Sequence, residues 1–204
     1  MIFTDKTVIK MATTTPTGCV SLQKSLEWCE GTSVYAGMRR RVYYISKGQI
    51  VKWPTLPRNE KTRQPTSSVY SGDFALKADA KFHYIDIVPE RSQHTSDPQG
   101  DRPSQTQLNK LTLVYPGVGA EASDACAYLN NNDNVFIWQD MDGNWRVTGC
   151  EKWPTKTTVA QDNGQGAAGT AGTTISVEAP DEVASPFYTG VIPAEDGDIN
   201  GTAA

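Results

Sequence analysis

The hydrophobic pattern changes its period several times along the chain, and the order of those changes predicts the elements of the fold. Residues 108–115 are rich in strand-favouring side chains, and Pro116-Gly117 ends the run. The next apolar residues are spaced as on a helix, at Ala122, Ala125, Cys126 and Leu129. An asparagine-rich stretch at residues 130–134 then ends that pattern. We therefore expect a strand followed by one short helix.

Two further apolar segments predict a β-hairpin after this helix. Residues 135–139 and 144–148 flank Asp142-Gly143, a pair that tolerates the positive φ of a tight turn. The last strand is expected at residues 173–178. Residues 164–169 match the letters GxGxxG, but a strand and not a helix follows them. These glycines are therefore interpreted as a hairpin loop, not as a nucleotide site.

The first half alternates strands with long polar connections. Strands are expected at residues 38–45 and 82–88, and residues 19–30 fit a short helix or a loop. Residues 52–72 are polar, basic and rich in proline, which predicts an exposed arm or, alternatively, a disordered insertion. Residues 89–107 predict a second polar connection. We expect a flexible extension over 1–18, one β domain over 19–190 and a flexible acidic tail over 191–204.

This order of elements resembles the C-terminal half of bacteriophage tail tube (major tail) proteins, in which a helix lies against the outside of a sheet and a hairpin follows it. The resemblance covers about the last hundred residues and has a weaker echo at residues 37–45. It rests on these segments: Asn134-Val135-Phe136-Ile137, Asp142-Gly143-Asn144-Trp145-Arg146-Val147-Thr148-Gly149, Gly172-Thr173-Thr174-Ile175-Ser176-Val177-Glu178 and Ala184-Ser185-Pro186-Phe187-Tyr188.

The resemblance implies a mainly β (α+β) fold, with sheets that form a sandwich or a barrel, one flanking helix and long arms. It also implies self-assembly into stacked, hexameric rings that conduct DNA without gripping it. The implied partners are further copies of the chain, the tape measure and tail completion proteins, and a sheath in contractile tails. The implied location is the virion tail, after synthesis in the cytoplasm of a bacterial host. No segment of the sequence is expected to enter a membrane.

Charge is distributed unevenly between the two halves of the chain. Residues 1–110 contain 16 Lys and Arg against 10 Asp and Glu, whereas residues 111–204 contain 3 against 13, so the halves carry +6 and −10 of the net −4. Such asymmetry suits subunits that stack or ring head to tail. An acidic C-terminal tail explains part of it equally well, because residues 178–198 alone supply six of the acidic residues.

Basic residues in the strand at 38–45 and in the 52–72 arm are the expected contacts between subunits. They are Arg39, Arg41, Arg58, Lys61 and Arg63. Strand alternation sends Arg39 and Arg41 to one face and Arg40 to the other, so the three arginines do not form one flat patch for nucleic acid.

Enzymatic chemistry finds little support in the sequence. Only His83 and His94 could act as a base at neutral pH, and no serine or cysteine nucleophile motif accompanies either. The Asp140–Gly143 segment lacks the ligand spacing of a calcium loop. Cysteines 19, 29, 126 and 150 have no zinc spacing and are expected as small buried residues, although a Cys19–Cys29 bridge is an alternative. We expect no catalytic residue, cofactor or metal.

A β-rich carbohydrate-binding or virion decoration module is the alternative function. It would use tryptophans as stacking platforms, namely Trp53, Trp138, Trp145 and Trp153. Tryptophans on strands are more often core residues.

Overall fold

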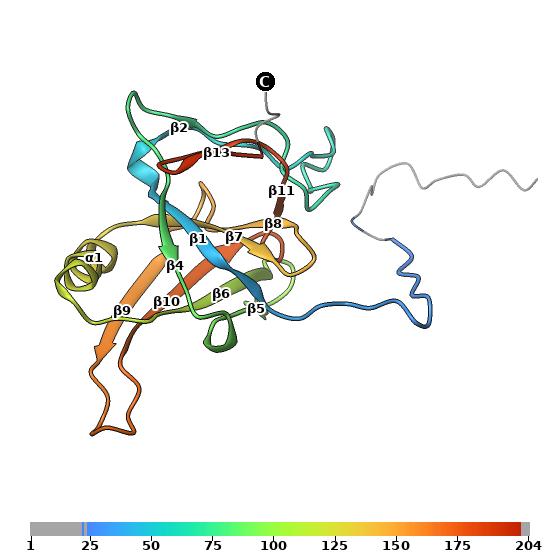
Figure 1. Ribbon diagram of the computed structural model, residues 1–204. Helices are drawn as coiled ribbons and strands as arrows, with labels where there is room; N and C mark the ends of the chain where they lie inside the picture. The colour runs from blue at the N-terminus through green and yellow to red at the C-terminus, as the bar shows by residue number, and fades with distance from the viewer. Residues whose placement is uncertain (1–21, 23, 201–204) are drawn as a thin grey trace, which may run out of the picture.

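The computed structural model describes Leu22 and residues 24–200 of the 204-residue chain. In this part the chain is mainly β, with two larger sheets stacked on one another and a single α-helix beside them (Figure 1). Two short β-hairpins and two 3-10 turns, Lys47–Gln49 and Pro89–Arg91, complete the secondary structure. The prediction of a mainly β fold with one flanking helix is confirmed.

The first sheet has five strands in the order β11-β8-β7-β1-β4, and every neighbouring pair is antiparallel. Its strands are β1 (Met38–Ser46), β4 (His83–Asp86), β7 (Asn134–Asp140), β8 (Trp145–Thr148) and β11 (Phe187–Tyr188). The predicted hairpin is therefore present as β7 and β8, with Gly143 at φ 92° in the turn. Only glycine adopts this backbone region without strain.

The second sheet has four antiparallel strands in the order β5-β6-β10-β9. Its strands are β5 (Gln93–Gln99), β6 (Thr106–Tyr115), β9 (Lys156–Asp162) and β10 (Gly172–Asp181). Alternate residues of β6 and β10 face inward, and Ile175 lies opposite Leu113 in the register. Such cross-strand apolar pairs stabilise a sheet locally. The glycine-rich segment at 164–169 lies in the β9–β10 hairpin, as predicted.

The five-stranded sheet is buried on both faces, which creates two separate cores. Val42, Phe136 and Trp138 pack with residues of β6 and β10 between the two sheets. On the opposite face, Ile45 and Ile137 pack beneath residues from the 52–76 region and from the C-terminal end of the chain. This explains the unbroken apolar run of β7, because a strand covered on both faces does not alternate.

Two short hairpins contribute to the second core and form the outermost layer in Figure 1. One consists of β2 (Ile50–Lys52) and β3 (Ala75–Leu76), and the other of β12 (Ile192–Ala194) and β13 (Gly197–Ile199). The β12–β13 hairpin corrects the prediction of a flexible tail over 191–204 for residues 191–200, because Ile192 and Ala194 are fully buried. In the sequence these two apolar residues stand beside several acidic residues, so they form no recognisable hydrophobic pattern. Residues 201–204 lie outside the described part of the chain.

Helix α1 (Ala120–Asn131) lies beside β9 and flanks a sheet, as the resemblance implied. Ala122 and Leu129 face the protein and are buried. The Asn130 side chain accepts a hydrogen bond from the backbone N–H of Val159 at 2.8 Å. The helix therefore occupies part of the outer edge of β9 and hinders another strand from pairing there.

Two predicted connections have more structure than the sequence indicated. Residues 89–107 contain β5, which pairs with β6 from Gln93–Thr112 to Gln99–Thr106. This strand is polar because it lies at a sheet edge, where even Pro98 is tolerated. The 52–72 arm pairs with itself through Thr55–Ser71 and Arg58–Pro65 bridges and joins the body through a Val69–Phe187 bridge. Its Leu56 and Tyr70 are buried.

The predictions for the N-terminal region are tested only in part. The described residues between Leu22 and Glu30 contain no helix, so the loop alternative holds there. The proposed extension over 1–18 and the Cys19 position lie outside the described residues.

Candidate functional site

Arg41, a predicted inter-subunit contact, is engaged within its own chain. Its guanidinium group donates to both carboxylate oxygens of Asp86, at 2.8 and 3.0 Å, and to Asp196 at 2.7 Å. It also lies 4.1 Å from the centre of the Tyr84 ring. The bond from Arg41 lowers the pKa of Asp86. Arg41 therefore links β1 and β4 to the turn between β12 and β13.

The expected alternation of the three arginines is wrong at Arg40. The register of β1 against β7 shifts between Met38 and Val42, which marks a bulge or irregularity in the strand. A bulge interrupts the period-two alternation of side chains. As a result Arg40 and Arg41 both approach Asp86, with Arg40 at 4.0 Å, and Arg39 is exposed.

The basic residues of the 52–72 arm divide into one that is paired and two that are exposed. Arg58 donates to Glu182 at 2.6 Å and to the backbone carbonyl of Arg63 at 2.8 Å. Lys61 and Arg63 are exposed at the tip, and neither forms an ion pair with any residue that the structure describes. The Asn59 side chain holds the tip by accepting the backbone N–H groups of residues 61 and 62.

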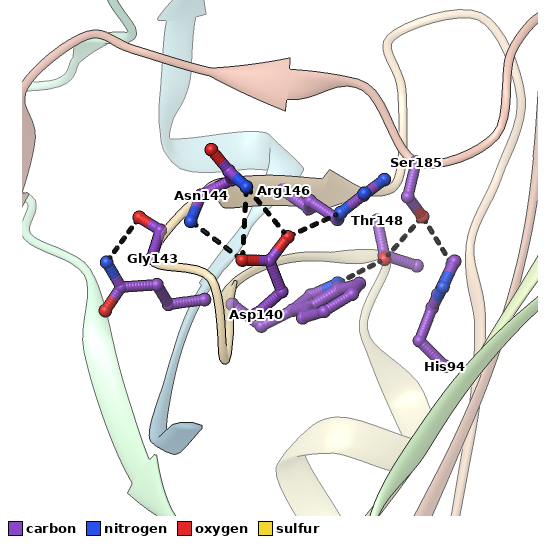
Figure 2. Close-up of polar contacts among 9 residues, drawn as sticks. His94, Asp140, Gly143, Asn144, Arg146, Thr148 and Ser185 are labelled. Carbon is purple, nitrogen blue, oxygen red and sulfur yellow. Dashed lines mark hydrogen bonds and ion pairs between the residues drawn. The ribbon is translucent and has the colours of Figure 1, made fainter. Parts of the chain in front are cut away.

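A buried polar network connects distant parts of the chain (Figure 2). The Ser185 hydroxyl lies 2.7 Å from Nε2 of His94 and 3.2 Å from the Thr148 hydroxyl. The indole N–H of Trp138 donates to Thr148 at 3.1 Å. The Asn109 side chain accepts the backbone N–H of Ser185 at 3.0 Å. The network thus joins β5, β6 and β8 to the segment before β11.

The Ser185–His94 pair has the spacing of a nucleophile and its base but lacks their other properties. Ser185 is fully buried, so no substrate reaches its hydroxyl. Burial, with a smaller effect of the Arg146 charge, lowers the pKa of His94 to about 4. No carboxylate among the described residues bonds the other ring nitrogen. A catalytic triad needs such an orienting acid, so we interpret this network as structural.

The turn between β7 and β8 is held by hydrogen bonds to the side chain of Asp140. Its carboxylate accepts the backbone N–H of Asn144 at 2.8 Å and Nε of Arg146 at 3.3 Å (Figure 2). Arg146 also lies 4.0 Å from the centre of the Phe187 ring. Within the described part of the chain, no group of three or more His, Cys, Asp and Glu is arranged to hold a metal ion.

The tryptophans are poorly placed as a stacking platform for sugars. Trp138 is buried between the sheets, and Trp53 packs against Phe74 at the edge of the second core. Trp145 donates to Asn200 at 3.0 Å, and Lys152 lies over Trp153.

The cysteines have three different environments. Cys150 is buried, and burial raises the pKa of its thiol. Cys126 is half-buried on α1, whereas Cys29 is exposed. The prediction of small buried cysteines is therefore right for Cys150 and wrong for Cys29.

An apolar segment outside both cores is the feature that the sequence analysis did not single out. Residues 24–37 extend away from the body (Figure 1), and they have no strand partner in the described structure. Leu26 is 96% exposed and Trp28 is 67% exposed, and Leu22, Val34 and Tyr35 are also exposed. Such a concentration of exposed apolar side chains marks an interaction site.

Two sheet edges are also open within the described residues. No strand pairs with the outer side of β5 or with that of β4, although β12 bridges to Phe82 just before β4 begins. Open edges offer unpaired backbone groups to another chain.

Comparisons with protein-family models, with curated proteins and with solved structures found no match to this chain. No helix in the described residues has the length and apolar character needed to cross a membrane. The assignment of a function therefore rests on the geometry above and on the resemblance in element order.

Proposed function

We propose that this protein is a self-assembling structural subunit of a bacteriophage tail tube, which forms stacked rings around a channel for DNA. One observation carries the proposal. The segment at residues 24–37 keeps large apolar side chains exposed, and each would gain about 1.5–3 kcal/mol on full burial. A contact with another copy of the chain would provide that burial.

The arrangement of elements supports the choice of this family over other self-assembling proteins. The resemblance implies a sheet, a helix against its outside, a hairpin and a final strand in that order. The chain has β6, α1, the β7–β8 hairpin and β10 in the same order, with α1 beside β9. In such an assembly the open edges of β4 and β5 would pair with neighbours, as closure of a barrel requires.

The alternative of a carbohydrate-binding module loses support because its four tryptophans do not share an exposed face. Under the tail tube hypothesis the partners would be further copies of the chain, tape measure and tail completion proteins and, in a contractile tail, sheath subunits. DNA would pass through the channel without specific contacts, and the location would be the virion tail.

Negative-stain electron microscopy across a concentration series, with light-scattering mass on the same samples, tests the proposal. We expect rings or stacked tubes with a central hole, and a mass that grows with concentration. A protein that remains a monomer at high concentration would contradict self-assembly. Closed dimers without a hole would contradict the tube.

A further inference from the structure

The exposed N-terminal segment has the pattern of a one-sided strand. Leu22, Leu26 and Trp28 are separated by even numbers of residues, so an extended backbone directs them to one face. In such a strand Lys24 would lie on that same face. Residues 24–30 are all exposed, and no described backbone group outside residues 29–32 bonds to them. The segment therefore presents both an apolar face and unpaired backbone groups.

A groove elsewhere on the molecule has the complementary properties. It has a volume of about 400 Å³ and lies between α1 and the edge strand β4. Its walls include the apolar side chains of Tyr44, Ile85, Leu129 and Ile175, and Glu121 adds a negative charge. A cavity of about 150 Å³ already admits a benzene ring. The groove can therefore admit an indole ring together with an aliphatic side chain.

The groove adjoins an open sheet edge, so backbone pairing and apolar burial can occur together. β4 is the last strand of the five-stranded sheet, and Tyr84, Ile85 and Asp86 of this strand line the groove. A strand added beside β4 would pair its backbone with that edge and direct one face of its side chains inward. Proteins recognise extended segments in this way by β-augmentation.

The segment and the groove of one molecule face away from each other. In Figure 1, α1 and β4 lie toward the left of the body, and residues 24–37 leave β1 toward the right. A contact between unlike surfaces on opposite sides of a subunit is heterologous. Such contacts generate rings or open filaments and not closed dimers.

We propose that residues 22–30 of one copy bind as an added strand along β4 of the next copy, with Leu26 and Trp28 in the groove between β4 and α1. Lys24 would approach Glu121 at the groove. This inference rests on the proposed function, because it specifies which surfaces join the subunits.

Paired variants of the full chain test the two surfaces separately. The donor variant combines Leu26→Ser with Trp28→Ser, and its control is Val34→Ser, which changes an exposed residue of the same segment outside the proposed strand. The acceptor variant is Ala125→Arg, which fills the groove, and its control is Ala127→Arg, an exposed position on α1 outside the groove. Thermal melting verifies that each variant folds.

We expect the donor variant and the acceptor variant each to self-associate at least about tenfold more weakly than the wild type. Each variant loses the burial of apolar side chains at the contact, and the free energy of that burial corresponds to at least about a tenfold change in affinity. The controls should assemble as the wild type does. A mixture of donor and acceptor variants retains one intact pair of surfaces. It should therefore form 1:1 heterodimers that grow no further, measured by light scattering.

The outcomes separate this inference from the proposed function. Rings from the wild type and from both surface variants would overturn the inference and leave self-assembly standing. A mixture without heterodimers would also overturn it, because the segment would then bind its own groove or none. A wild type that stays monomeric would refute the proposed function instead.

A binding measurement tests the groove even without assembly. A fluorescent peptide of residues 22–32 should bind the full chain, and its affinity should fall at least about tenfold in Ala125→Arg but not in Ala127→Arg. Equal binding to both variants, or no binding to the wild type, would overturn the inference.

Discussion

The buried histidine makes the sharpest prediction about stability. His94 has a folded pKa of about 4, against an ordinary value of 6.5, because burial disfavours the charged ring. The native state must therefore exclude a proton that the unfolded state binds as the pH falls below 6.5. Linkage over this interval gives a loss of about 3 kcal/mol in the free energy of unfolding between pH 7 and pH 4. His94→Gln should lack this loss.

Urea denaturation of the wild type and His94→Gln at a series of pH values measures the effect. The difference in unfolding free energy between the two proteins should shift by about 3 kcal/mol in favour of His94→Gln from pH 7 to pH 4. His83→Gln is the control, because this histidine is half-exposed and its surface pair with Glu195 is worth at most about 1 kcal/mol. A difference that stays within about 1 kcal/mol across the range would refute the buried, neutral state of His94.

Three other changes have defined outcomes. The pKa of Asp181 is raised to about 6 by burial, so its contribution to stability should fall by roughly 3 kcal/mol from pH 4 to pH 7. Asp181→Asn should remove this fall, and urea denaturation that shows the same fall in the variant would contradict it. Ile192→Ala should cost about 2–5 kcal/mol, because the side chain is fully buried, whereas a flexible tail would give a change below about 0.5 kcal/mol in the same assay. Rings should persist when NaCl is raised to about 1 M, since apolar contacts are not screened, and light scattering that shows dissociation would indicate charge-based contacts.

The contributions of His94 and Asp181 to the free energy of unfolding change in opposite directions with pH. Single variants are therefore needed to observe either contribution. Between pH 4 and pH 7 the contribution of His94 rises as that of Asp181 falls, and each spans about 3 kcal/mol. The two contributions nearly cancel in the wild type. A flat pH profile of the unmodified protein would therefore be compatible with two strongly perturbed groups.

The elements that the sequence predicted correctly are those with a local apolar pattern. The run before Pro116, the helical spacing around Leu129 and the Asp142-Gly143 turn each identify one element, and the structure has β6, α1 and the β7–β8 turn at these places. The missed elements lack such a pattern. β5 is polar on both faces because it lies at an edge, and β12 buries only two apolar residues beside Pro193.

The contacts of the site could not be predicted because they depend on the tertiary fold. His94 and Ser185 are 91 residues apart in the sequence, and neither belongs to a motif that would indicate their contact. Arg41 was expected at a subunit interface, but the β1–β4 register places it opposite Asp86, and its guanidinium group bonds that carboxylate. Which residues lie opposite one another on strands that are far apart in the sequence is not visible in the pattern of side chains.

Part of the uneven charge of the two halves is used inside the subunit. Basic residues of the first half meet acidic residues of the second half in ion pairs, namely Arg41–Asp196, Lys47–Asp133 and Arg58–Glu182. Exposed pairs of this kind contribute at most about 1 kcal/mol each. They engage Arg41 and Arg58, two of the five basic residues that the sequence offered for contacts between subunits. The apolar segment around Leu26 and Trp28 has no comparable partner in the described structure. Charge can orient two copies as they approach, but in the proposed assembly the free energy that holds them together would come from burial of that segment.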